Sequence, residues 1–108
     1  METKIALHCF RALSQETRLK IFRLLVHHGQ DGIAAGKIAE ALQCPVSTLS
    51  FHLKSLQEAN LIRSGRNGRS LIYTANFAQA RALNDYLYEK CCGGAPCATT
   101  QILKEPQS

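Results

Sequence analysis

Apolar side chains recur at every third or fourth position along most of this chain, and this spacing predicts a mainly helical protein. The clearest case is Leu49, Leu53 and Leu56, which fall within a narrow arc of one helical face. Glycine, proline and polar clusters separate the periodic stretches and set their expected ends. The stretches that we predict to be helical are residues 3–13, 15–28, 36–42, 46–59 and 77–92.

Local signals place the ends of these helices. Ser14 is expected to cap the second helix, because a serine hydroxyl can accept a hydrogen bond from a first-turn amide. Asn76 is expected to cap the last helix, and Gln79 stands three residues later, where it would complete a capping box. Gly93 and Gly94 should end that helix.

The same periodicity predicts which side chains face the core. The expected inward positions of the first two helices are Ile5, Cys9, Leu19 and Phe22, with either Leu25 or Val26. A cysteine on an apolar helix face is expected to be a small core residue, so Cys9 is assigned to the core. Cys44, in the break between two short helices, is assigned to packing and not to ligand binding.

Two short predicted helices flank the break Gln43-Cys44-Pro45, and proline suits a helix start better than a helix interior. This arrangement is typical of a helix-turn-helix. Asn67-Gly68, within residues 61–74, is a strong signal for a two-residue hairpin turn. We therefore predict a mainly α protein with a β-hairpin wing, a winged helix-turn-helix. Its modest core predicts a homodimer.

The polar face of residues 46–59 predicts contact with DNA. Small hydroxyls can bond phosphates or base edges, and a lysine can meet a phosphate. Two interpretations of Phe51 stay open: it contacts a thymine methyl group, or it packs under the hairpin. His52 likewise either contacts DNA or packs near the helix start. The candidate DNA-binding residues on this helix are Ser47, Thr48, Ser50, Phe51, His52 and Lys54.

The predicted wing adds three candidates, Arg63, Arg66 and Arg69. Arg66 and Arg69 flank the predicted turn, where they could reach phosphates or a minor groove. The alternative is a hairpin that is merely solvated. The net charge supports a polyanion partner, because residues 36–75 carry a net charge of +3 out of +5 for the whole chain.

Length and composition bear on the number of domains and on the location of the protein. A chain of 108 residues is one domain by size. We divide it into residues 1–92, for DNA binding and dimerisation, and a C-terminal tail, residues 93–108. No signal peptide or stretch long enough to span a membrane is visible, so we expect a cytoplasmic protein with no membrane partner.

Three of the five cysteines, Cys91, Cys92 and Cys97, fall within seven residues. An odd number of cysteines, with three clustered, is a poor disulfide framework and indicates reduced thiols. Three thiolates this close can converge on one soft ion. The alternative is an inert tail.

The stretches Leu13–Ile21 and Leu49–Leu56 closely resemble the ArsR (ArsR/SmtB) family of bacterial metalloregulatory repressors, over about residues 5–90. The resemblance implies a homodimer joined through its first and last helices. It also implies that the dimer binds operator DNA and releases it when an inducer binds.

The resemblance also implies where an inducer site could lie. The founding arsenical repressors carry cysteines in the helix before the turn, but residues 37–42 contain none. The zinc-sensing branch uses Asp and His pairs on the last helix, and no histidine follows His52. Cys91, Cys92 and Cys97 resemble a subgroup with an arsenic site of three C-terminal cysteines.

Ligand number favours As(III) or Sb(III) at these cysteines, because three thiolates satisfy such an ion as a pyramid whereas Zn(II) prefers four ligands. Cys9 of a partner helix, or a water, could supply a fourth ligand for another soft or borderline metal, such as Cd, Pb or Zn. A thiol-redox sensor is the other alternative. It is disfavoured because a helix C-terminus opposes thiolate formation.

An enzymatic function is not expected. His8-Cys9 hints at the phosphate-binding loop of thiol phosphatases and some arsenate reductases, but that loop needs an arginine where Gln15 stands. A DNA-binding module with a purely structural zinc is a third class, and it would show no ligand-driven release from DNA.

Overall fold

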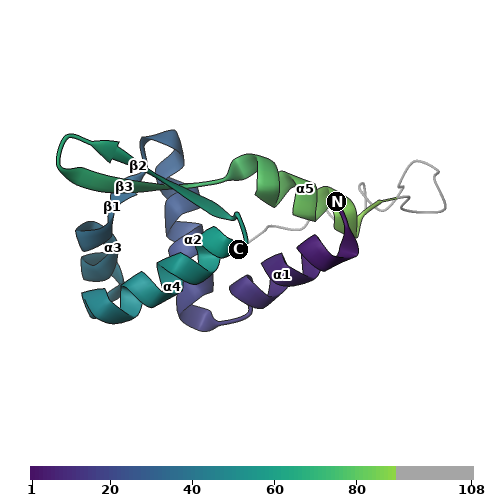
Figure 1. The fold of residues 1–108 in the computed structure, drawn as a ribbon, viewed down its shortest axis with the longest axis horizontal. Helices are drawn as coiled ribbons and strands as arrows, with labels where there is room; N and C mark the ends of the chain where they lie inside the picture. Colours follow the sequence, from purple (N-terminus) through teal and green to yellow (C-terminus); the bar gives the residue numbers. More distant parts are fainter. Residues whose placement is uncertain (90–108) are drawn as a thin grey trace, which may run out of the picture.

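The structure, a computed structural model, describes residues 1–89 and is mainly helical with one small sheet (Figure 1). This confirms the predicted winged helix-turn-helix. The helices are α1 (Thr3–Leu13), α2 (Glu16–His28), the 3₁₀ turn η1 (Gly29–Asp31), α3 (Ala35–Leu42), α4 (Val46–Glu58) and α5 (Phe77–Leu87). The strands are β1 (Ile33–Ala34), β2 (Ile62–Asn67) and β3 (Ser70–Ala75).

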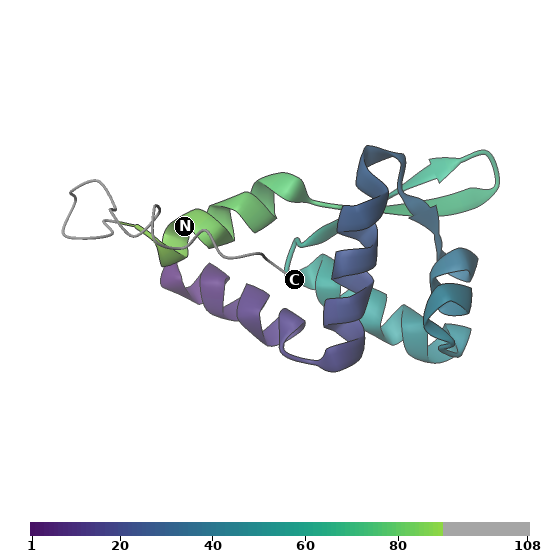
Figure 2. The same cartoon turned by 180° about the vertical axis from the view of Figure 1, so that it is seen from behind.

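The elements divide the described part into two ends. The helix-turn-helix of α3 and α4 and the β2–β3 wing lie at one end, and α1 and α5 run side by side at the other (Figures 1 and 2). A hydrogen bond of 2.6 Å between Thr3 Oγ1 and the Tyr86 hydroxyl joins α1 to α5. None of the helices within residues 1–89 combines the length and the hydropathy that a membrane-spanning segment requires.

The sheet is antiparallel in the order β1-β3-β2. Because Asn67 pairs with Ser70, the two turn residues are Gly68 and Arg69, so the predicted turn at Asn67-Gly68 is wrong by one residue. Gly68 occupies the first turn position with φ of +66°, a conformation that glycine adopts at no steric cost. The sequence pattern predicted the hairpin correctly but not the residue at which it turns.

β1 lies in residues 29–35, between two predicted helices, where the sequence pattern predicts no strand, and its two residues pair with Tyr73 and Ile72 of β3. Gly32 makes this approach possible: a Cβ added there would lie 2.6 Å from Ile72 Cγ2 and 2.7 Å from the Tyr73 carbonyl oxygen, and φ is +72°. A two-residue strand has no periodicity of its own, so only its partner strand defines it.

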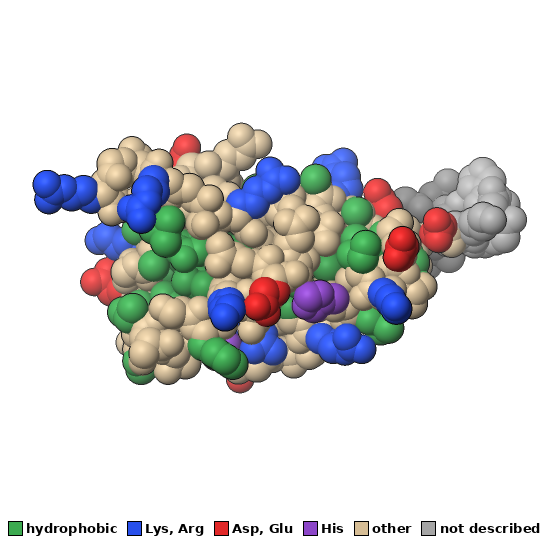
Figure 3. Space-filling view, viewed as in Figure 1, with side chains coloured by type: hydrophobic (Ala, Val, Ile, Leu, Met, Phe, Trp, Pro, Cys, Tyr) green, Lys and Arg blue, Asp and Glu red, His purple; other side chains and the backbone are tan. Residues whose placement is uncertain are grey.

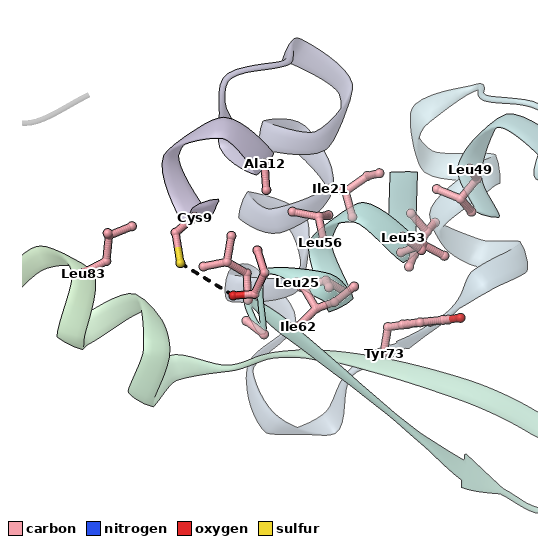
Figure 4. Close-up of a cluster of buried hydrophobic side chains, with 14 of the residues drawn as sticks. Cys9, Ala12, Ile21, Leu25, Leu49, Leu53, Leu56, Ile62, Tyr73 and Leu83 are labelled. Carbon is pink, nitrogen blue, oxygen red and sulfur yellow. Dashed lines mark hydrogen bonds between the residues drawn. The ribbon is translucent and has the colours of Figure 1, made fainter. Parts of the chain in front are cut away.

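The core gathers around α4, and Leu49, Leu53 and Leu56 are buried as predicted (Figure 4). The predicted inward face of α2 is wrong in part, since Leu19 is 43% exposed while Ile21 and Leu25 are fully buried. The buried stripe of α2 therefore begins at Ile21, four residues before Leu25, and Leu19 lies on a different face.

The predicted inward face of α1 is also wrong in part. Ile5 is 44% exposed, whereas Cys9 is fully buried among core side chains, as predicted. The Cys9 thiol donates to the Ala59 carbonyl oxygen at 3.6 Å (Figure 4). α1 thus faces the core through its small residues, Ala6, Cys9 and Ala12, which permit close approach of α4 and α5.

Two cap predictions need correction. Gln15, and not Ser14, caps α2, because its Oε1 accepts from the Arg18 amide at 2.9 Å while the Ser14 hydroxyl donates back to the Arg11 carbonyl. Asn76 caps α5 as predicted, but Gln79 does not complete a capping box. The Asn76 amide already donates to the Leu61 carbonyl at 2.8 Å, which leaves Gln79 to bond elsewhere.

The α5 helix ends at Leu87, earlier than the predicted end at residue 92. Tyr88 closes it, with its amide donating to the carbonyls of the preceding turn. The three cysteines of the predicted inducer site, Cys91, Cys92 and Cys97, lie outside the described residues.

Candidate nucleic-acid interface

The turn between α3 and α4 sets the direction of the candidate recognition helix, α4. Gln43 adopts a left-handed conformation (φ of +52°), and its amide and that of Cys44 bond carbonyls in the last turn of α3. Pro45 then occupies the N-cap position, with its carbonyl accepting from the Leu49 amide at 2.9 Å. Cys44 is half-buried against the core, in agreement with its predicted packing role.

The outer face of α4 presents the predicted hydroxyl and lysine side chains to solvent. Phe51 lies among them and is 67% exposed, so the interpretation that it packs under the hairpin is wrong. A large exposed apolar side chain within a polar face is typical of a binding surface. The exposed residues of this face are Ser47, Thr48, Ser50, Phe51 and Lys54.

The structure places His52 differently. It is only 9% exposed, and its Nδ1 lies 3.4 Å from Arg18 Nη1. The burial supports the packing interpretation and removes His52 from the side chains that can reach DNA directly. Arg18 was not among the predicted site residues, because its partner stands 34 residues away in the chain.

Burial lowers the pKa of His52 below the ordinary value of 6.5, and the nearby positive charge of Arg18 lowers it further. The neutral form of the imidazole therefore predominates at pH 7. Because a guanidinium can only donate, the neutral ring accepts at Nδ1 and carries its proton on Nε2.

This shift predicts that folding stability depends on pH through His52. As the pH falls through 6.5, the unfolded chain binds a proton that the folded chain does not yet bind, so the free energy of unfolding decreases. The stabilisation is complete above pH 6.5 and is lost as the pH falls to the folded-state pKa. Urea unfolding between about pH 7.5 and 5.5 should show this slope, and His52→Gln should reduce it.

His27→Gln is the matched control, because His27 is exposed at the end of α2. The control should retain the slope of the unsubstituted protein. Equal slopes for the unsubstituted protein and the His52→Gln variant would contradict the assignment.

The wing carries the three predicted arginines, all exposed. Arg63 lies opposite Thr74 and Arg66 opposite Leu71, while Arg69 occupies the turn itself. The ion pairs found within residues 1–89 join Lys20 to Glu16 and Lys37 to Glu40, so none of the wing arginines forms an ion pair there. Figure 3 shows basic side chains projecting from this end of the molecule.

The wing is fixed to α4 by a side-chain hydrogen bond, in which Gln57 Nε2 donates to Ser64 Oγ at 3.1 Å. Leu61 and Ile62, at the start of β2, are buried in the common core. The base of the wing is therefore packed against α4, so one duplex could contact both the arginines and the outer face of α4.

Across residues 1–89, no three His, Cys, Asp or Glu side chains come together in a way that could hold a metal ion. Cys9 cannot donate to a site outside its own core, because its side chain is fully buried. Burial raises the pKa of its thiol, an effect partly offset by a hydrogen bond from Gln79. This burial disfavours the alternative in which Cys9 of a partner helix supplies a fourth ligand.

Comparison with known sequences identifies the helix-turn-helix and related transcriptional regulators. A family model described as a helix-turn-helix domain matches residues 13–65. The cadmium resistance transcriptional regulatory protein CadC of Listeria innocua is 38% identical over 59% of this chain and 52% of its own length. The arsenical resistance operon repressor of Bacillus subtilis is 32% identical over 77% of this chain and 74% of its own length. The chain thus matches about half the length of the cadmium regulator.

Solved structures of transcriptional regulators also resemble this chain. An ArsR-like transcriptional regulator from Rhodococcus sp. RHA1 has a TM-score of 0.67 and 30% identity, covering 95% of this chain and 96% of its own. The homodimeric winged helix-turn-helix domain of Mb0332 from Mycobacterium bovis has a TM-score of 0.65 and 25% identity, covering 79% and 83%. With its wing, its helix-turn-helix and these relatives, the chain belongs to the ArsR/SmtB-type family of transcriptional regulators.

Proposed function

We propose that this regulator is a homodimeric repressor that binds operator DNA and releases it when As(III) or Sb(III) binds Cys91, Cys92 and Cys97. The single observation that carries the choice of inducer is the presence of three thiols within seven residues, shortly after α5. Three thiolates meet the full coordination demand of a trigonal thiophilic ion.

In the proposed complex, α4 of each protomer enters a major groove, and the two half-sites lie about one helical turn apart. Hydroxyls and Lys54 would contact phosphates and base edges, and the exposed Phe51 ring would contact a thymine methyl group. The wing arginines would contact phosphates flanking each half-site.

The proposed inducer site lies close in sequence to the helices that the family uses for dimerisation. Cys91 follows the end of α5 by four residues, and α5 bonds α1 through Tyr86 and Thr3. An ion bound to these cysteines would therefore act on the α1–α5 end of each protomer. A change there alters the spacing of the two recognition helices, which lowers affinity for a fixed operator.

Cd(II), Pb(II) or Zn(II) is the alternative inducer, and the cadmium regulator among the relatives favours testing Cd(II). Zn(II) would need a fourth ligand. A thiol-redox response is a further alternative, in which peroxide would replace metal as the inducer.

The test is a titration of the protein–DNA complex. A duplex is first selected by the full-length protein from a random DNA library, and its complex is then titrated with arsenite, antimonyl tartrate, Cd(II), Zn(II) and peroxide. We expect palindromic DNA to be selected and arsenite or antimonyl to release it at the lowest concentrations. Release by Cd(II), Zn(II) or peroxide alone would refute the proposed inducer but leave the repressor assignment intact.

A further inference from the structure

Arg18 joins three helices through one side chain. Its backbone lies in the first turn of α2, where its amide donates to Gln15 Oε1. Its Nε donates to the Ala12 carbonyl oxygen of α1 at 2.7 Å, and its Nη1 lies 3.4 Å from His52 Nδ1 of α4. The residue therefore contacts the family's dimerisation helix and the recognition helix at once.

The hydrogen bond from Arg18 Nε reaches α1 at its C-terminus, where backbone carbonyls lack donors within the helix. Ala12 lies in the last turn, and its carbonyl has no partner within the helix. Ala12 is also 5% exposed, so water has little access to the site. A cation at a helix C-terminus gains further from the helix dipole. The short bond at Nε should therefore hold the guanidinium in place.

The bond to α4 then has a fixed donor. His52 is nearly buried in the middle of α4, directly after Phe51, whose ring meets the His52 ring edge-on with centroids 6.0 Å apart. Any rotation of α4 that moves His52 away from Arg18 also moves Phe51 and Lys54 on the outer face. The position of the His52 ring therefore depends on the orientation of the outer face of α4.

We propose that Arg18 is a positioning residue that couples α1 to the recognition helix, by holding His52 in its Nε2-protonated form and so fixing the orientation of α4. The inference rests on the proposed operator binding and adds the internal link through which the dimerisation end could act on α4. The guanidinium is required because its fork serves two acceptors in fixed directions, which a lysine ammonium does not.

The polar and charged groups near this link come from two helices. His8 and Arg11 of α1 and Ser55 and Glu58 of α4 line the same small cavity as Arg18. Glu58 is the one carboxylate among these residues, so it is the group with which a displaced guanidinium would pair. Glu58→Gln therefore tests whether Arg18 acts through its contact with His52 or through attraction to the Glu58 carboxylate.

The test compares Arg18→Met, Arg18→Lys, His52→Gln and the Arg18→Met/His52→Gln double variant in the full-length protein. The probe is the duplex selected by the unsubstituted protein. We expect Arg18→Met to weaken DNA binding about tenfold, Arg18→Lys to restore little of it, and the double variant to be no weaker than the worse single variant. Arg11→Met, an exposed arginine of the same cavity, and Glu58→Gln should stay within about twofold.

A second readout needs no DNA. Nitrogen-15 spectra of the histidine rings should show His52 protonated at Nε2 and accepting at Nδ1, and Arg18→Lys should change this pattern. If Arg18→Met does not fold, the Arg18→Lys spectrum and affinity decide the matter. An unchanged His52 spectrum in Arg18→Lys, or additive losses in the double variant, would overturn the proposal. Failure of the unsubstituted protein to select DNA would instead refute the proposed function.

Discussion

Serine at position 91 should leave operator binding intact and abolish release by arsenite. A hydroxyl is a poor ligand for a soft ion, so Cys91→Ser removes one of three proposed donors without altering the described DNA-binding face. In the unsubstituted protein, arsenite should lower operator affinity by roughly 5- to 150-fold, the usual range of allosteric coupling. In Cys91→Ser, and equally in Cys97→Ser, this factor should fall to about one.

The matched control is Cys44→Ser. Of the two cysteines in the described residues, Cys44 is the one with partial solvent access, and its thiol donates to the neighbouring Pro45 carbonyl at 3.5 Å. This variant should bind operator and respond to arsenite like the unsubstituted protein. Operator release from Cys91→Ser at ordinary arsenite concentrations would eliminate the proposed inducer site.

Ligand number can be measured independently of DNA. Thiol titration of the native protein with and without arsenite should show three thiols protected by one equivalent of the metalloid. Cys9 should react slowly in both cases, because it is fully buried and burial raises its pKa. Protection of two thiols would instead indicate that one cysteine of the three lies outside the site.

The sequence predicted the described helices and the wing because each depends on local information. The stripe of Leu49, Leu53 and Leu56 defines the inner face of α4 without reference to any other element. The polar face opposite follows directly, which is why most of the candidate DNA contacts were found at exposed positions. Recognition of the fold therefore needed only short-range patterns.

The errors arise where tertiary contacts choose between local alternatives. Ser14 and Gln15 are both capable caps, and the choice depends on Ser14 donating back to α1. The hairpin turned one residue later than predicted because the β2–β3 register is set along the whole strand pair. Such choices have a small local energy difference, and neighbouring elements decide them.

The Arg18–His52 contact is another feature that local sequence patterns could not predict. Each residue was visible in the family-like stretches, but no periodicity links positions 34 residues apart. A histidine with hydroxyl neighbours on a helix resembles a DNA contact in sequence. Its burial depends on how α4 packs on α1 and α2, which only the fold determines.

Neutralising the wing should produce the largest loss of DNA affinity, and the loss should be independent of sequence. Arg66 and Arg69 are exposed at the tip of the hairpin. A homodimer presents two wings, so Arg66→Gln with Arg69→Gln removes up to four phosphate contacts. Each contact contributes about −0.9 to the slope of log affinity against log salt concentration, so the magnitude of the slope should decrease by up to about 3.6.

Affinity should therefore be measured over a range of salt, from about 50 to 200 mM, on the selected operator and on unrelated DNA. Both duplexes should lose affinity to a similar extent, because phosphate contacts carry no sequence information. Lys20→Gln removes a charge that is paired with Glu16 on α2 and should leave the slope unchanged. A loss confined to the operator would show that the wing arginines read bases, and an unchanged slope would show that the wing does not touch the duplex.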